Sequence, residues 1–264
     1  MILLIPQLED EKLRELEYRN VKLSELAMSI RIGETPKSGV RTVVREAYSN
    51  HPVHAPVVML KMGHFTDEFE RIDWTMVRAD MEGQEELEVN LPVEGDVLIE
   101  PEDLLIHLRG QHRVIRITEQ MMDEMPNDLL GRGLKLAATN NFILMRPDQK
   151  TVYPPFLQIV MDILLEEVSR EWAAVRNDQP SDNLLHDFLR WKYAESVGST
   201  KSVGTPIGAR ELNRLSIDIP AEQWAQRAWA HRYNLLIYQE KLAMEKKHQF
   251  RSNLSQYINP NFKK

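Results

Sequence analysis

The sequence predicts an α+β protein: a mixed strand and helix N-terminal half, residues 1–154, and a mainly helical C-terminal half, residues 155–264, ending in a long amphipathic helix. Short β-branched and apolar runs between turn residues dominate the first half. Apolar residues at three- and four-residue spacing dominate the second half. With 264 residues, of which 42% are hydrophobic and 28% charged, the chain is long enough to bury a sizeable core.

The first half begins with a segment that predicts a helix over residues 8–32. Four leucines between Leu13 and Leu26 lie on or near one stripe, and Gly33 is placed to end the helix. Two short strands are then expected at 40–44 and 56–62, separated by the loop sequence NHPVHAP.

The acidic middle of the chain predicts alternating short elements. Two strands are expected in ELEVNLPV and GDVLIE, and the stretch PEDLLIHLRG predicts a short helix because proline and acids begin it and glycine ends it. HRVIRI predicts a strand. A helical stretch is expected from Thr118, resuming after Pro126 and reaching about Ala138, and FILMRPDQKTVYP then has the form of a hairpin with its turn at 146–149.

The second half predicts three helices. The first begins at the prolines before Phe156 and carries apolar residues to Val175 on one face. The second covers 182–197 and stops at Gly198, after which GSTKSVGTPIG, residues 198–208, is expected to be a mobile loop or linker. The third is expected from Ile219 to Phe250.

The last helix carries an apolar line that predicts burial against the two preceding helices. Both of its tryptophans and its histidine are expected in the core, because the apolar face is broader than a two-helix seam. After Met244 too few apolar residues remain for a core, so this end is expected to fray or to dock on another surface. The apolar line consists of Trp224, Ala228, His231, Leu235, Tyr238 and Leu242.

Several classes of protein are disfavoured by what the sequence lacks. Without cysteine there is no disulfide, thiolate metal site or cysteine nucleophile. Neither GxSxG, GxxxxGK[ST] nor GxGxxG occurs, so no catalytic motif and no cofactor is predicted. The absence of a signal-peptide pattern and of a run of about 20 apolar residues predicts a cytoplasmic protein, or one incorporated in a particle assembled in the cytoplasm.

Charge is segregated along the chain, whose net charge is −7. Segment 67–103 holds fourteen acidic residues against Arg71 and Arg78, whereas residues 241–264 hold six basic residues against Glu245 alone. Two solvated faces would explain this pattern. A functional alternative is association of acidic with basic ends, since opposite potentials steer binding. The acidic segment is also a candidate mimic of a phosphate backbone.

Histidine and carboxylate groups give weaker signals of a metal or catalytic site. His51, His54 and His64 lack the HExxH arrangement and a clear third ligand, and exposed loop histidines are the simpler interpretation. His107 and His112 are expected to flank a helix end. The carboxylates of the helix from Phe156 are expected to face water rather than a metal. These carboxylates are Asp162, Glu166, Glu167 and Glu171.

The sequence predicts a non-catalytic structural or interaction subunit of a larger assembly, for example a phage particle. Its partners would be other protein subunits or copies of itself, joined through the acidic face and the basic aromatic tail. The alternative is a nucleic-acid-binding accessory protein that uses the same tail, because nucleic-acid sites interleave basic and aromatic residues. The candidate contact residues are Lys246, Lys247, Phe250, Arg251, Tyr257, Phe262, Lys263 and Lys264.

Overall fold

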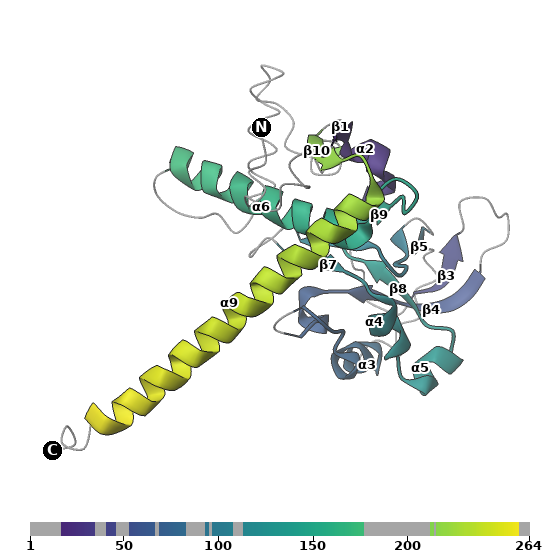
Figure 1. The fold of residues 1–264 in the computed structure, drawn as a ribbon. Coiled ribbons are helices and arrows are strands. Elements are labelled where there is room, and N and C mark those ends of the chain that lie inside the picture. Colours follow the sequence, from purple (N-terminus) through teal and green to yellow (C-terminus); the bar gives the residue numbers. More distant parts are fainter. Residues whose placement is uncertain are drawn as a thin grey trace.

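The chain combines β-sheets and helices, which confirms the predicted α+β class. A computed structural model describes residues 17–34, 41–45, 53–66, 69–82, 93–94, 97–107, 113–176, 212–213 and 215–258. In Figure 1, strands and short helices form a body, and the long C-terminal helix α9 (Gln223–Ile258) extends away from it.

The body is built around a four-stranded antiparallel sheet with the strand order β2-β9-β6-β7. Its two middle strands are β9 (Phe142–Pro147) and β6 (Leu104–His107). Its edge strands are β2 (Ala27–Ile32) and β7 (Val114–Arg116).

The middle strands of this sheet are buried on both faces. Along β6, Leu104 and Ile106 belong to one apolar core, whereas Leu105 belongs to a second core on the opposite face. Along β9, Ile143 and Leu144 alternate between the same two cores. Successive side chains of a strand point to opposite faces, so a strand covered on both sides consists of consecutive apolar residues.

This double burial explains why the predicted helix over 101–110 is wrong. The run Leu104–His107 has no alternation of polar and apolar residues, and a short continuous apolar run does not distinguish a strand from a buried helix. The structure places the run as β6, hydrogen-bonded between β7 and β9. The neighbouring strand prediction in HRVIRI is confirmed by β7.

A second four-stranded sheet has the strand order β5-β3-β4-β8 and packs over one of the two cores. Its β3 (Arg41–Arg45) and β4 (Val53–Leu60) confirm the two predicted strands, although β4 starts inside the predicted loop NHPVHAP. The remaining strands are β5 (Val93–Glu94) and β8 (Lys135–Ala138). Of the two predicted strands in the acidic segment, ELEVNLPV lies outside the described residues except for Val93 in β5. The described part of GDVLIE, 97–100, forms only an isolated bridge between Leu98 and Ala137, so a strand there is wrong.

Short helices cover the same core. They are η1 (Met62–His64), α3 (Trp74–Glu82), α4 (Glu119–Asp123) and α5 (Asn127–Gly131). The predicted start at Thr118 is confirmed, because its hydroxyl accepts a hydrogen bond from the Met121 amide at 3.1 Å and caps α4.

Two predictions that follow Thr118 are wrong. The helical stretch ends at Gly131 instead of reaching Ala138, and β8 then pairs in parallel with β4. The predicted hairpin after Phe142 is absent, since β9 pairs with β2 and β6, and the chain turns directly into a helix after Val152. Both errors arise because long-range strand pairing overrides local propensity.

The helix predicted over residues 8–32 is wrong where the structure describes it. The segment forms β1 (Tyr18–Lys22), the four-residue helix α2 (Leu23–Leu26) and then β2. Strand β1 pairs in antiparallel register with β10 (Ser216–Pro220), which joins distant parts of the chain. Val21 and the two leucines of α2 are buried in the core that α9 also reaches.

Gly33 has a different role from the predicted helix stop. Its amide donates to the Phe142 carbonyl at 3.0 Å, and a Cβ at this position would lie 2.2 Å from the carbonyl oxygen of Thr139. Glycine therefore permits the close approach of two backbone segments.

The predicted helix from the prolines before Phe156 is confirmed as α6 (Pro154–Arg176), which covers the outer face of the central sheet. The last predicted helix is confirmed as α9, and β10 precedes it. The predicted helix 182–197 and loop 198–208 lie outside the described residues, and the division into 1–154 and 155–264 stays a prediction.

Replacing Gly33 tests the backbone contact that joins β2 to the β8–β9 connection. We expect Gly33→Ala to lower the free energy of unfolding by roughly 2–4 kcal/mol, because the methyl group overlaps the Thr139 carbonyl. Gly63→Ala is the matched control, since a Cβ there meets nothing within 4 Å. Chemical denaturation measures both, and equal stabilities of the two variants would contradict the assignment.

Candidate nucleic-acid interface

The first turns of α9 are fixed in the body by a buried amide. Gln226 is fully buried; its Oε1 accepts from the Tyr153 amide at 2.8 Å, and its Nε2 donates to the Pro220 carbonyl at 3.1 Å. Ala225 and Trp229 are buried beside it. These contacts hold the start of α9 against the turn before α6 and the end of β10.

Most of the predicted core face of α9 is exposed, from Trp224 in the first turn onward, so that prediction is wrong for most of its residues. Trp224 is 58% exposed and Tyr238 is 64% exposed, and His231 is also exposed. Of the two tryptophans only Trp229, 9% exposed, enters the core. Periodicity shows that a helix has an apolar face, but it does not show whether the covering surface belongs to the same chain.

The candidate basic residues lie toward the far end of this helix. The backbone stays helical to Ile258, so the end predicted to fray after Met244 continues α9. Lys246 and Lys247 are exposed, and Figure 1 shows the end of α9 standing clear of the body. Phe250, Arg251 and Tyr257 follow on the same helix; Phe262, Lys263 and Lys264 lie outside the described residues.

An ion pair connects the middle of α9 to the body. Lys241 Nζ lies 3.7 Å from Glu70 Oε1, and both side chains are exposed. Exposed ion pairs contribute about 0–1 kcal/mol to the free energy of unfolding, so this contact adds little to the stability of the fold.

Several acids of segment 67–103 are paired within the fold. Arg146 forms a two-bond contact with the buried carboxylate of Asp103, at 3.0 and 2.8 Å, and lies 3.0 Å from Glu100. Glu102 accepts from Arg116 at 2.7 Å. Burial raises the pKa of Asp103, against the opposing effect of Arg146. Part of the acidic segment therefore serves internal contacts.

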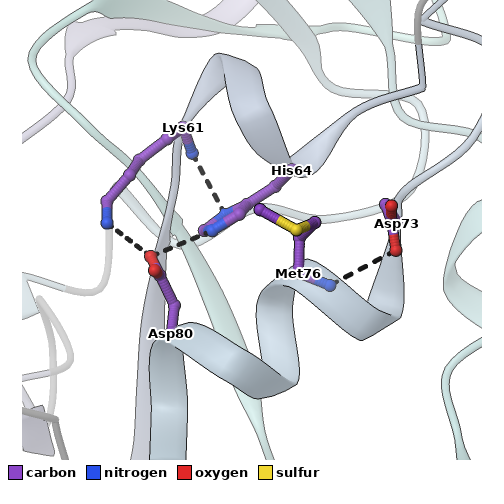
Figure 2. Close-up of polar contacts among 5 residues, drawn as sticks. All are labelled: Lys61, His64, Asp73, Met76 and Asp80. Atoms are coloured by element: carbon purple, nitrogen blue, oxygen red, sulfur yellow. Dashed lines mark hydrogen bonds and ion pairs between the residues drawn. The ribbon is translucent and has the colours of Figure 1, made fainter. Parts of the chain in front are cut away.

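His64 belongs to one of these internal clusters, shown in Figure 2. The Lys61 amide donates to His64 Nδ1 at 3.3 Å, which leaves Nε2 to donate to Asp80 Oδ2 at 3.0 Å, and the Lys61 ammonium pairs with the same carboxylate. Burial lowers the pKa of His64 despite Asp80. Burial acts to raise the pKa of Asp80, but Lys61 and His64 lower it overall. The cluster joins η1 to α3.

The histidines considered as metal ligands, and set aside in favour of exposed loop histidines, have separate positions where the structure describes them. His64 is buried in the cluster just described rather than exposed in a loop, His54 lies in β4, and His51 lies outside the described residues. Within the described ranges no three histidine or carboxylate groups form a possible metal site. His107 lies in β6 with its ring 5.3 Å from that of Phe142, not at a helix end, and His112 is not described.

Asp162 differs from the predicted solvated carboxylates of α6. Glu166 is exposed as predicted, but Asp162 is partly buried and its Oδ1 accepts from the Val114 amide at 3.0 Å. Burial raises the pKa of Asp162 to about 6, although this hydrogen bond and Arg113 act in the opposite direction. Burial also raises the pKa of Tyr233 on α9, and the charge of Asp162 adds to that effect. This group thus lies where α6, α9 and β7 meet.

Several solved structures match this chain, and two of them are the following. One is the HsdS subunit from Thermoanaerobacter tengcongensis, with a TM-score of 0.41, 15% identity, and coverage of 92% of this chain and 42% of that chain. The other is a chain of a type I R-M system, with a TM-score of 0.43, 14% identity, and coverage of 96% and 46%. This chain spans less than half the length of either. No family model and no curated protein matches it.

These comparisons correct the predicted function. One of these structures is an HsdS subunit and the other comes from a type I R-M system, and neither is a virion protein. The prediction of a structural subunit, for example of a phage particle, joined through an acidic face and a basic tail is therefore wrong. Within the described ranges no helix is long and apolar enough to cross a bilayer. The predictions of a non-enzymatic, cofactor-free and cytoplasmic protein stay predictions.

Asp162 makes stability depend on pH. Because its pKa is raised above that of an ordinary aspartate, the folded state holds the proton more tightly, so the contribution of Asp162 to stability falls as pH rises from about 4 to about 6 and is then level. We expect Asp162→Asn to raise the free energy of unfolding by on the order of 2–3 kcal/mol near neutral pH. The gain should shrink toward pH 4.

Denaturation at about pH 7.5 and about pH 4.5 measures the effect of Asp162→Asn. Glu166→Gln is the matched control, because it removes one charge from an exposed position of the same helix. A gain that is the same at both pH values would contradict the assigned pKa.

Proposed function

We propose that the chain is a nucleic-acid-binding accessory protein that contacts the phosphate backbone of duplex DNA through the basic end of α9. The observation that carries this proposal is the exposure of Lys246 and Lys247 on a continuous helix that stands clear of the body.

The charge around these lysines suits phosphate binding. Between residues 241 and 251 the helix holds four Lys or Arg residues against Glu245. Positions 247 and 251 are one helical turn apart, so they share a side of α9. Lysines that neutralise phosphates release condensed counterions, which favours binding and makes it depend on salt.

The acidity of the body favours a contact in which DNA meets only the far end of α9. The net charge of the chain is −7, and exposed acids such as Glu70 and Glu82 would repel phosphates from the body. A helix about 10–12 Å wide matches the width of the major groove of DNA, about 12 Å. The projecting end of α9 can therefore approach a duplex while the acidic body stays at a distance.

The two similar solved structures agree better with this proposal than with the virion component that it replaces. Protein partners also belong to the proposal, because one of the two structures is an HsdS subunit and the other belongs to the complex of a type I R-M system.

Salt-dependent binding to a labelled duplex of about 20 base pairs tests this function. We expect Lys246→Ala with Lys247→Ala to weaken binding at low salt and to reduce the slope of log affinity against log salt by about 2, because each phosphate contact contributes about 0.9. Fluorescence anisotropy measures the affinity across a salt series, and a single strand of equal length shows whether a duplex is required.

The matched control for this experiment is Lys135→Ala with Lys150→Ala. It removes the same charge from two exposed lysines of the body. A flat titration of the unaltered chain at low salt would remove the proposal, and so would equal losses in the two double variants.

A further inference from the structure

The exposed side of α9 carries a seven-residue repeat. We call Trp224, Ala228, His231, Leu235, Tyr238 and Leu242 the apolar stripe; they follow one another at alternating steps of four and three residues, the spacing of a coiled-coil seam. Leu235 is 47% exposed and Leu242 is 38% exposed. Glu245 occupies the next position of the repeat and ends the stripe.

The positions on both sides of the apolar stripe are basic or neutral. In a two-helix contact these flanking positions face the flanks of the partner helix and determine which partner is accepted. No acid occupies a flank between residues 225 and 248. The charged or titratable flanking residues are Arg227, Arg232, Lys241, Lys246 and His248.

This pattern disfavours a second copy of α9 as the occupant. Whether two α9 helices ran parallel or antiparallel, their facing flanks would bring basic residues together, and such like-charge contacts oppose association. Glu70 of the body already lies 3.7 Å from Lys241, which shows that an acidic group is accepted beside this face.

We propose that the apolar stripe docks one amphipathic helix of a partner protein, with aliphatic residues on its seam and glutamate or aspartate on both of its flanks. The stripe spans about 27 Å from Trp224 to Leu242 at 1.5 Å per residue, which matches five turns of a partner helix. The partner's acids meet the basic flanks while its aliphatic residues cover Leu235, Tyr238 and Leu242.

This surface is distinct from the proposed DNA contact, although Lys246 borders both. The partner helix depends on the apolar stripe, whereas phosphate binding depends on Lys246 and Lys247. Substitutions in the stripe should therefore leave DNA affinity unchanged, so the two proposals can fail separately.

Two synthetic peptides of about 21 residues serve as probes for the full chain. Both carry leucine at the seam positions, and they differ only in having glutamate or lysine at the flanks. By calorimetric titration we expect the glutamate peptide to bind at least about tenfold more tightly, because its flanks complement those of α9. Arg232→Glu with Lys246→Glu should reverse this preference.

Substitutions within the chain separate the stripe from other exposed apolar residues. Leu235→Gln with Leu242→Gln should weaken binding of the glutamate peptide at least about tenfold. Leu236→Gln with Met244→Gln is the matched control, because both residues are exposed but lie off the stripe, and it should bind as the unaltered chain does. Circular dichroism checks that each variant is folded.

Four results would overturn the proposal. The first is that neither peptide binds, and the second is that both peptides bind with equal affinity. Light scattering shows a dimer that Leu235→Gln with Leu242→Gln converts to a monomer, which would make a second copy the occupant. The same variant of a monomeric chain melts at a clearly lower temperature than its control, which would show that the chain covers its own stripe.

Discussion

The buried amide of Gln226 is the contact on which the presentation of α9 depends. It joins the Tyr153 amide, just before α6, to the Pro220 carbonyl at the end of β10, and so fixes the start of α9 against two other elements. A buried amide group that lacks a hydrogen-bond partner destabilises the fold by about 1–3 kcal/mol. The position of α9 that satisfies both hydrogen bonds of Gln226 is therefore favoured over positions that break either one. Trp229 adds apolar burial at the same place.

From this anchored start the helix carries two surfaces outward. The apolar stripe begins within the first turns and the lysines lie beyond it on the same continuous helix, whose end lies away from the body (Figure 1). The acids that pair with Arg146, Arg116 and Lys61 stabilise the body internally. The acidic and basic parts of the sequence therefore have separate roles. Acids of the body form internal ion pairs, whereas the basic residues lie on the exposed helix α9.

The elements predicted correctly from the sequence include a helix with apolar residues at helical spacing and a helix that begins at a capping residue. Helix α6 shows a one-sided apolar face, and α4 begins at a threonine cap. The errors lie at 104–107 and 135–138, where strands pair with partners distant in the sequence. Local pattern does not reveal such pairing, because a strand buried on both faces loses its alternation.

The candidate site was predicted in part for the same physical reason. The basic composition around 246 and 247 indicates a contact site, and the structure shows both lysines exposed. The apolar line through Trp224 and Tyr238 was assigned to the core, because helical periodicity describes one face without identifying what covers it. The sequence does not indicate that Gln226 is buried, since a lone glutamine in an amphipathic helix usually faces water.

Amide hydrogen exchange along α9 tests most directly the claim that an anchored root presents an exposed contact helix. In the free chain we predict slow exchange at 225–230 and faster exchange from 235 onward, because packing protects only the root. Adding duplex DNA should slow exchange around 246–251 and leave the root unchanged. Uniform protection along the whole helix in the free chain, or no change near 246–251 with DNA, would contradict the account.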